Sequence, residues 1–199
     1  MGVILSKQIQ LPCKINYINF LQSSGTQYID TGFMPTQNTR VVCQVSGFPK
    51  TSYSQSVFGT RTSSSSSDRF GFIAAEDLAA YRSDFYNNNV GFDSSVTFNG
   101  AFVIDKNKAA TTLGGSASKS NTSGVFTSKY PMFLFGYNTA GALSMPATAL
   151  AVYYCQIYES DVLVRDLWPC LDEGGVACMY DKVSKTYYYN AGTGEFIAG

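Results

Sequence analysis

The stretch that decides the fold is YYCQIYESDVLVRDLWPC, residues 153–170. Its first part has a period of two, with polar Gln156 placed between apolar or aromatic neighbours. Successive side chains of a β-strand point to opposite faces of the sheet. The pattern therefore predicts a strand in which Tyr153, Cys155 and Ile157 face inward and Gln156 faces outward.

A hairpin follows this strand. The segment 159–161 is short and polar and separates two apolar runs, which is typical of a tight turn between paired strands. Pro169 has no N–H to give to a ladder, so we expect the second strand to end there. The segment 181–185 indicates another turn, and 187–189 a further strand. The last third of the chain thus predicts an antiparallel sheet.

The same period continues towards the N-terminus, and helical patterns are rare. The expected strands cover residues 26–31, 41–45, 57–60, 69–73, 96–104, 108–113, 132–137 and 148–158. Small polar residues at 62–67 and 114–124 indicate loops, and residues 74–80 predict one or two helical turns. Many short strands with frequent Gly and Ser turns favour an all-β fold, an antiparallel β-sandwich of the jelly-roll type.

Two blocks of this chain resemble one family of all-β modules. The C-terminal block runs from 153–170 through MYD at 179–181 to NAGTGEF at 190–196, and the N-terminal block is SSGTQYIDTGF at 23–33 with NTRV at 38–41. Both are similar to the laminin-G-like or concanavalin-A-like jelly rolls found in phage and prophage virion proteins and in surface proteins of gut Gram-positive bacteria. The resemblance implies a concanavalin-A-like sandwich over residues 20–199.

The composition limits the classes of function that the chain can have. The chain has 199 residues, which suits one domain, and 14 basic and 14 acidic residues, so its formal net charge is zero. Because no basic stripe is visible, we expect no nucleic-acid partner. No apolar run approaches the roughly 18 residues that cross a bilayer, so we expect no membrane span. The N-terminus lacks a convincing secretory signal, and together with the resemblance this implies a virion protein that is made in the bacterial cytoplasm.

Cysteine and histidine usage excludes several chemistries. The chain has no histidine, which excludes Ser-His-Asp triads, Cys-His dyads and histidine-metal triads. It has an odd number of cysteines without CxxC spacing, and we expect all of them to be free thiols: Cys13, Cys43, Cys155, Cys170 and Cys178. We therefore predict no catalytic residue, no metal site and no cofactor. A structural calcium ion, which related modules often hold, is the alternative, but the acidic residues are scattered.

The enzymatic alternative is a glucanase-like glycoside hydrolase, because glucanases share this jelly roll. Such a reaction needs two carboxylates across one sugar bond. Glu76 and Asp77 are adjacent, as are Asp172 and Glu173, so each pair would face opposite ways on a strand. Glu159 and Asp161 have the right spacing but lie in a predicted turn. The sequence therefore favours a protein that is not an enzyme.

Sugar binding is the ligand chemistry that the composition favours. Sugar sites combine an aromatic face with Asn, Asp and Arg side chains, and the segment 81–89 has this makeup. The candidate ligand-binding residues are Arg61, Asp68, Arg69, Tyr81, Arg82, Tyr86 and Asn88. Trp168, the one tryptophan of the chain, is flanked by Leu167 and Pro169 and is predicted to lie in the core rather than to form a platform.

Residues 1–19 precede the first block and form a predicted N-terminal arm. It is either an extra edge strand or an anchor that docks on a neighbouring subunit. The candidate anchor residues are Val3, Ile4, Leu5, Ile9 and Leu11. With the resemblance, these features predict a homo-oligomeric, most often trimeric, phage or prophage virion protein. It would decorate the capsid or the tail and bind host-surface glycan. The alternative is a carbohydrate-binding or adhesin module on a bacterial cell surface.

Overall fold

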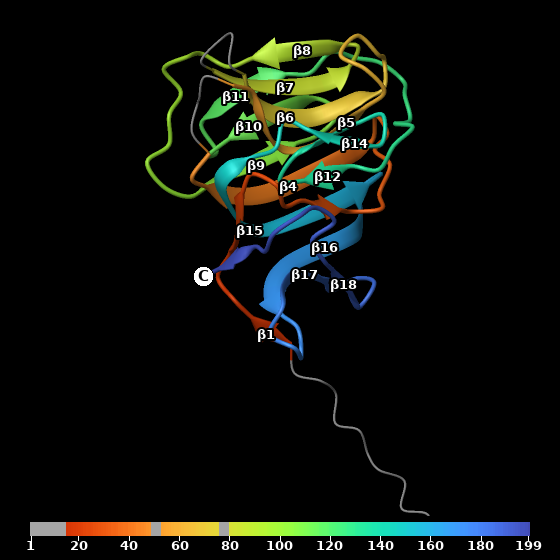
Figure 1. Cartoon of the computed structure of the whole chain (residues 1–199). Coiled ribbons are helices and arrows are strands. Elements are labelled where there is room, and N and C mark those ends of the chain that lie inside the picture. The colour runs from red at the N-terminus through yellow and green to blue at the C-terminus, as the bar shows by residue number, and fades with distance from the viewer. Residues whose placement is uncertain (1–14, 49–52, 76–79) are drawn as a thin grey trace, which may run out of the picture.

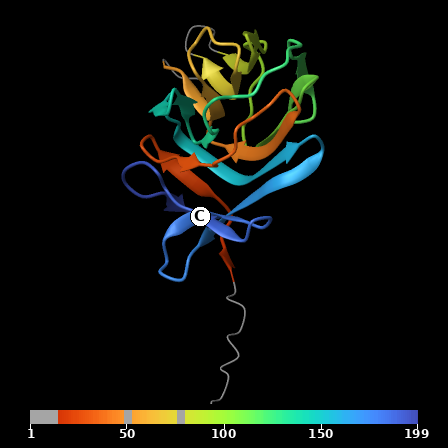
Figure 2. The same ribbon diagram turned by 90° about the vertical axis from the view of Figure 1, so that its right-hand side faces the viewer.

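The computed structural model describes residues 15–48, 53–75 and 80–199. Over these ranges the chain forms strands and no helix. Two sheets pack face to face in an open sandwich (Figures 1 and 2). The predicted all-β antiparallel β-sandwich is confirmed.

Sheet A has eleven strands. Eight follow the order β11-β10-β9-β4-β15-β16-β17-β18, while β1 pairs with β16, and β2 pairs with β15 and β19. Their bounds are β1 Asn16–Tyr17, β2 Leu21–Ser24, β4 Thr39–Ser46, β9 Phe102–Lys106, β10 Ala110–Leu113, β11 Ala117–Ser120, β15 Thr148–Glu159, β16 Val162–Leu171, β17 Ala177–Asp181, β18 Thr186–Tyr188 and β19 Ile197–Ala198. In Figure 1 the β16–β18 end extends away from sheet B towards β1.

Sheet B has eight strands. Six follow the order β14-β13-β5-β6-β7-β8, while β12 pairs with β3 and β5. Their bounds are β3 Ile29–Asp30, β5 Gln55–Arg61, β6 Arg69–Ala75, β7 Ala80–Tyr86, β8 Asn88–Gly91, β12 Phe133–Leu134, β13 Tyr137–Thr139 and β14 Ala142–Ser144. All pairings are antiparallel except that between β13 and β5.

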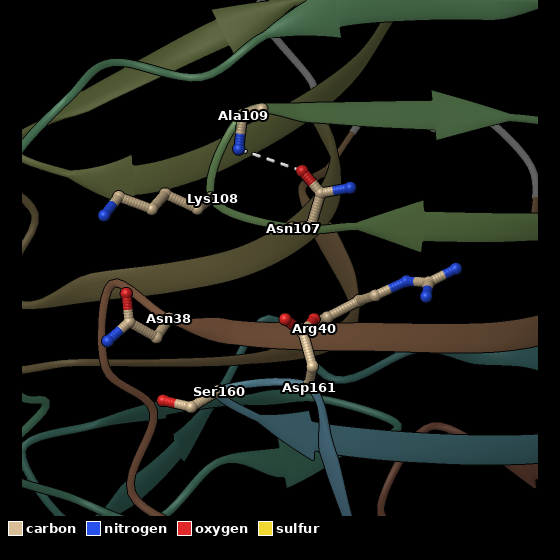
Figure 3. A pocket seen from close by; sticks show the side chains of 7 residues that line it. All are labelled: Asn38, Arg40, Asn107, Lys108, Ala109, Ser160 and Asp161. Atoms are coloured by element: carbon tan, nitrogen blue, oxygen red, sulfur yellow. Dashed lines mark hydrogen bonds between the residues drawn. The ribbon is translucent and has the colours of Figure 1, made fainter.

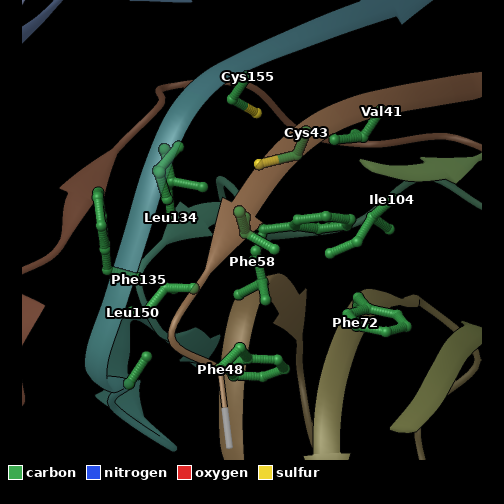
Figure 4. Packing of buried hydrophobic residues seen from close by; sticks show 14 of the residues in the cluster. Val41, Cys43, Phe48, Phe58, Phe72, Ile104, Leu134, Phe135, Leu150 and Cys155 are labelled. Atoms are coloured by element: carbon green, nitrogen blue, oxygen red, sulfur yellow. The ribbon is translucent and has the colours of Figure 1, made fainter. Parts of the chain in front are cut away.

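The core lies between the sheets and is rich in phenylalanine (Figure 4). Strand β4 alternates strictly between buried and half-buried side chains, as the sequence pattern of 41–45 predicts. Phe58 and Phe72 of sheet B are fully buried opposite Cys43 and Ile104 of sheet A. Full burial of such a side chain stabilises the fold by roughly 1.5–3 kcal/mol. Because the alternation puts the apolar side chains of a strand on one face, it decides which faces of the two sheets pack together.

The β15–β16 hairpin departs from the sequence prediction in two places. Cys155 and Ile157 are buried as predicted, but Tyr153 is only half-buried, because β15 has an irregular register between Val152 and Tyr154. Strand β16 does not end at Pro169 but continues to Leu171. The carbonyl of Pro169 accepts a hydrogen bond from the Ile18 N–H at 3.1 Å, and the missing proline N–H leaves no gap in the ladder to β17.

The strand expected at 96–104 begins only at Phe102. Two further predictions were wrong in part. Residues 74–80 do not form a helical turn where the structure describes them, because Ala75 at the end of β6 pairs with Ala80 at the start of β7. The expected loop 114–124 contains strand β11, which pairs with β10 through residues such as Lys119. In both cases a backbone ladder with a neighbouring strand outweighs the local preference of small residues.

The N-terminal arm is described only from residue 15. Its short strand β1 joins the border of sheet A, with Asn16 opposite Leu171 and Tyr17 opposite Cys170. The candidate anchor residues Val3, Ile4, Leu5, Ile9 and Leu11 lie outside the described residues. Among the residues that are described, no helix has the length and apolar character needed to cross a bilayer.

Candidate functional site

The outer face of sheet A carries half-exposed polar and aromatic side chains. In β15, Tyr154, Gln156 and Tyr158 alternate with the buried Cys155 and Ile157. The period of two that builds the core therefore also presents every second residue of the strand on the outer face.

Four aromatic side chains line up across this face. The Tyr154 and Trp168 rings stack with centroids 5.5 Å apart, Trp168 pairs with Tyr180 on β17, and Tyr180 pairs with Tyr187 on β18. Tyr154, Trp168, Tyr180 and Tyr187, called the aromatic row below, occupy one register of four neighbouring strands. Since strands in a sheet lie about 4.8 Å apart, the row is roughly 14 Å long.

Hydrogen bonds fix the centre of the row. The Trp168 Nε1–H donates to Asp166 Oδ1 at 2.7 Å, and the Gln156 amide donates to the same oxygen at 3.1 Å. The Tyr158 hydroxyl in turn donates to Gln156 Oε1 at 3.1 Å. The Lys182 ammonium lies 3.7 Å from the centroid of the Trp168 ring. The indole is thus held by a carboxylate at its edge and a cation on its face.

A polar pocket lies at the loop end of the same sheet (Figure 3). Its volume is about 540 Å³, and three chain segments frame it: the start of β4, the turn between β9 and β10, and the turn between β15 and β16. We call it the end pocket; its lining residues are Asn38, Arg40, Asn107, Lys108, Ala109, Ser160 and Asp161. In Figure 3 the Asn107 turn lies above and the Ser160–Asp161 turn below.

Local turn chemistry shapes the end pocket. Ser160 and Asp161 have φ values of 48° and 66°, and two consecutive left-handed residues make a tight hairpin turn whose twist matches its strands. The Asn107 Oδ1 accepts the N–H of Ala109 at 2.9 Å, which closes the opposite turn. Both walls are therefore formed by short turns rather than by long loops.

The charges around the end pocket are nearly balanced. Arg40 donates two hydrogen bonds to Asp105, at 2.9 and 2.7 Å, and these bonds raise the pKa of Arg40. Within the described part of the chain, no hydrogen bond or ion pair engages the side chains of Lys108, Ser160 or Asp161. The pocket thus offers the Lys108 ammonium, the Ser160 hydroxyl and the Asp161 carboxylate, whose charge also helps to raise the pKa of Arg40. This suits a neutral ligand with many hydroxyl groups.

The pocket and the aromatic row lie on one continuous surface. The Arg40 guanidinium lies 5.6 Å from the centroid of the Tyr158 ring. Tyr158 is hydrogen-bonded to Gln156, and Gln156 to the Asp166 that holds Trp168. A chain of contacting side chains therefore links the end pocket to the row.

The seven ligand-binding residues predicted from sequence lie in different places. Asp68 and Tyr86 line a separate pocket of about 350 Å³. Arg69 donates to the carbonyls of Tyr86 and Ser64, at 3.4 and 2.9 Å, and is buried. Tyr81 faces the core, where its hydroxyl donates to the carbonyl of Phe48.

The other three predicted residues lie on sheet B. Arg61 stacks on the Tyr137 ring at 4.9 Å, and Arg82 Nε lies 3.6 Å from Asp84. Asn88 donates to Thr122 on the surface. The alternation along β7 explains this scatter, because neighbouring residues of 81–86 point to opposite faces. The structure therefore brings Asp68, Arg69 and Tyr86 together and separates them from Tyr81.

The predicted core position of Trp168 was wrong. Its indole is half-buried on the outer face, whereas Leu167, the residue before it, is fully buried in the core. Apolar neighbours along a strand face the opposite side, so they say little about the tryptophan between them. The signal that could have found the row is the spacing of aromatic residues on either side of each hairpin turn.

Two comparisons with known proteins do not extend this picture. A scan against protein-family models and a search of curated proteins each found no match to the chain. Among the described residues, no group of three or more Cys, Asp or Glu side chains is placed to hold a metal ion. The four described cysteines, Cys43, Cys155, Cys170 and Cys178, are free and buried.

Proposed function

We propose that this protein is a non-enzymatic, glycan-binding β-sandwich of a phage or prophage virion, and that it attaches the particle to host-surface glycan through the outer face of sheet A. The observation that carries the proposal is the aromatic row, which crosses four neighbouring strands. The end pocket supplies hydrogen-bonding groups at one end of the same face.

The row supplies aromatic rings for a sugar, which must displace the Lys182 side chain to reach the face of Trp168, because the Tyr154 ring stacks on the indole and the Lys182 ammonium lies 3.7 Å from its centroid. Sugar rings present C–H groups on their faces, and these pack against flat aromatic rings, while their hydroxyls need donors and acceptors nearby. Asp166 and Gln156 flank Trp168 and are already positioned by their mutual hydrogen bonds. Little side-chain entropy remains to be lost on binding, and such preorganisation favours affinity.

The end pocket favours an uncharged ligand. The bidentate bond to Asp105 balances the charge of Arg40, which leaves one cation at Lys108 and one anion at Asp161. A polyanion would be repelled by Asp161, and a polycation by Lys108. A neutral polysaccharide satisfies both side chains through its hydroxyl groups.

The place on a virion is supported by the sequence resemblance described above. The chain's zero net charge also suits a protein that assembles with other copies, because a neutral surface lacks long-range self-repulsion. In this proposal the arm contacts neighbouring virion proteins or other copies of the chain. The glycan-binding face then stays free for the host.

The test of the proposal is binding of the purified protein to an array of bacterial surface polysaccharides, followed by calorimetry with the best ligand. We expect Trp168→Ala and Tyr180→Ala each to weaken binding about tenfold, which corresponds to roughly 1.4 kcal/mol for one lost stacking ring. The matched control is Tyr53→Ala, since Tyr53 is 46% exposed and precedes β5 of sheet B.

Two results would contradict the proposal. Equal affinity of wild type, Trp168→Ala and Tyr180→Ala would place any glycan elsewhere on the molecule. Turnover of the glycan, with loss of activity on changing one carboxylate to its amide, would show an enzyme instead. Light scattering of the protein with and without residues 1–19 tests the assembly part, for which we expect an oligomer that dissociates without the arm.

A further inference from the structure

The described cysteines form two pairs at directly opposed positions of antiparallel strands. Cys43 of β4 is opposite Cys155 of β15, and Cys170 of β16 is opposite Cys178 of β17. The first pair lies in the apolar core between the sheets, where Figure 4 shows both sulfur atoms among phenylalanine and leucine side chains. The second pair lies elsewhere, at the projecting end of sheet A.

The geometry of the second pair suits a covalent bond. The two Sγ atoms are 3.6 Å apart, and the Cβ atoms of directly opposed residues in antiparallel strands are roughly 4.5–5.5 Å apart. Disulfides join Cβ atoms at about 3.5–4.5 Å, with sulfurs near 2.05 Å. Side-chain rotation and a small local adjustment of the strands would therefore bring the sulfurs to bonding distance.

The surroundings make Cys170 the more reactive thiol. A hydrogen bond from the Cys178 S–H lowers the pKa of Cys170, while the same bond and burial raise the pKa of Cys178. Cys170 has the same parity as Trp168 on β16 and so lies towards the outer face. It is opposite Tyr17 of the two-residue strand β1, and the Tyr17 side chain is 46% exposed. Movement of this short border strand would expose Cys170 and Cys178 to solvent. Cys43 and Cys155 instead lie in the core between the two sheets.

We infer that Cys170 and Cys178 are a reversible dithiol–disulfide site that closes when the protein meets a disulfide oxidant such as oxidised glutathione. The Cys170 thiolate attacks one sulfur of the oxidant and releases one glutathione thiolate. Cys178 then loses its proton to that thiolate and attacks the Cys170 sulfur, which releases the second glutathione thiolate. The protein dithiol is oxidised and one glutathione disulfide is reduced to two thiols.

The bond would link β16 to β17 two residues from Trp168 and Tyr180. It would thereby fix the hairpin that carries the centre of the aromatic row. The thiols would be free in a reducing cytoplasm and oxidised after release, when the particle meets an oxidising environment. This inference concerns the hairpin alone and does not depend on glycan binding.

The test uses the full-length protein with Cys13→Ser, which removes the one cysteine outside the described residues. The protein is equilibrated in glutathione buffers of increasing oxidation, its free thiols are alkylated under denaturing conditions, and its peptides are mapped by mass spectrometry. We expect a peptide pair linked through Cys170 and Cys178, and alkylated Cys43 and Cys155. We also expect a melting temperature roughly 5 °C higher that dithiothreitol reverses.

Three variants make the test decisive. Cys170→Ser and Cys178→Ser should each abolish both the linked peptide and the rise in melting temperature. Tyr17→Ala should speed oxidation several-fold, because it uncovers Cys170. The inference is overturned if Cys170 and Cys178 remain free thiols in excess oxidised glutathione and are then alkylated, or if Cys43 and Cys155 form a disulfide first. An unchanged oxidation rate in Tyr17→Ala would overturn the role of β1 as a cover.

Discussion

The stability of this protein should depend on pH through one buried amine. Lys106, at the end of β9, is fully buried and points into the core. Its Nζ lies 4.9 Å from the Phe70 ring centroid and 5.1 Å from that of Phe85, and donates to Ser83 Oγ at 2.6 Å. Burial lowers the pKa of Lys106 to about 7, although the Asp84 carboxylate opposes this change.

The sign follows from proton binding in the two states. Between about pH 7 and 10.5 the unfolded chain holds a proton on Lys106 that the folded chain has lost, so stability rises with pH. At 1.36 kcal/mol for each pH unit, the cost of burying the charged amine is of the order of 5 kcal/mol well below pH 7. Between pH 7.5 and 9 the folded protein should gain about 2 kcal/mol from this group.

The assay is urea unfolding of wild type and Lys106→Met at several pH values between 7.5 and 9. Methionine has a similar length and needs no charge in the core, so the variant should lose this gain while other groups titrate as before. Lys108→Met, an exposed change two residues away, is the matched control and should keep the wild-type profile. Parallel profiles for wild type and Lys106→Met would refute the reasoning.

Three further changes test the packing of the sandwich. Gly71→Ala would place a Cβ 2.5 Å from the Tyr137 ring and should cost about 1–3 kcal/mol in urea unfolding. Burial opposes ionisation of Asp181, but hydrogen bonds from backbone N–H groups keep its pKa below the usual value. Asp181→Asn should therefore cost about 1–3 kcal/mol at pH 7, and this cost should shrink as pH falls below 4. Asn190→Ala removes an acceptor for the Tyr28 N–H and a donor to the C-terminal tail, so limited proteolysis should cut the tail faster.

Much of the fold could be predicted from sequence because its signals are local. The period of two in 41–45 and 153–158 shows directly which side chains face the core, and the structure buries Cys43, Cys155 and Ile157 as predicted. The prediction that the strand ends at Pro169 was wrong. A proline can lie within a strand if its nitrogen points to a side on which the ladder needs no N–H donor.

The candidate site was harder to predict, because its residues are far apart in sequence. Trp168 meets Tyr154 and Tyr180 only through the registers of two hairpins, and a register shift of one residue would move its side chain to the other face. The segment 81–89 has the composition of a sugar site, but the alternation along β7 divides it between the core and the outer face. Composition along the chain therefore did not show which of these side chains share a face.

Buried polar groups such as Lys106 leave no local signal at all. It is opposite Val41 and Thr111 in sheet A, and only the packing of sheet B places Phe70 and Phe85 around its amine. Similarly, position 71 holds a glycine because the Tyr137 ring lies over it and leaves no room for a Cβ. Tyr137 belongs to a strand that is far from Gly71 in sequence. Such contacts depend on how the two sheets stack, which no local pattern encodes.

The most direct test of the central claim uses the single tryptophan of the chain. Trp168 lies in the aromatic row, so intrinsic tryptophan fluorescence reports on the proposed glycan site alone. Titration with a neutral host polysaccharide should give a saturable change in this fluorescence, and Tyr180→Ala should weaken it about tenfold. Glycan binding that calorimetry detects without any change in Trp168 fluorescence would contradict the account.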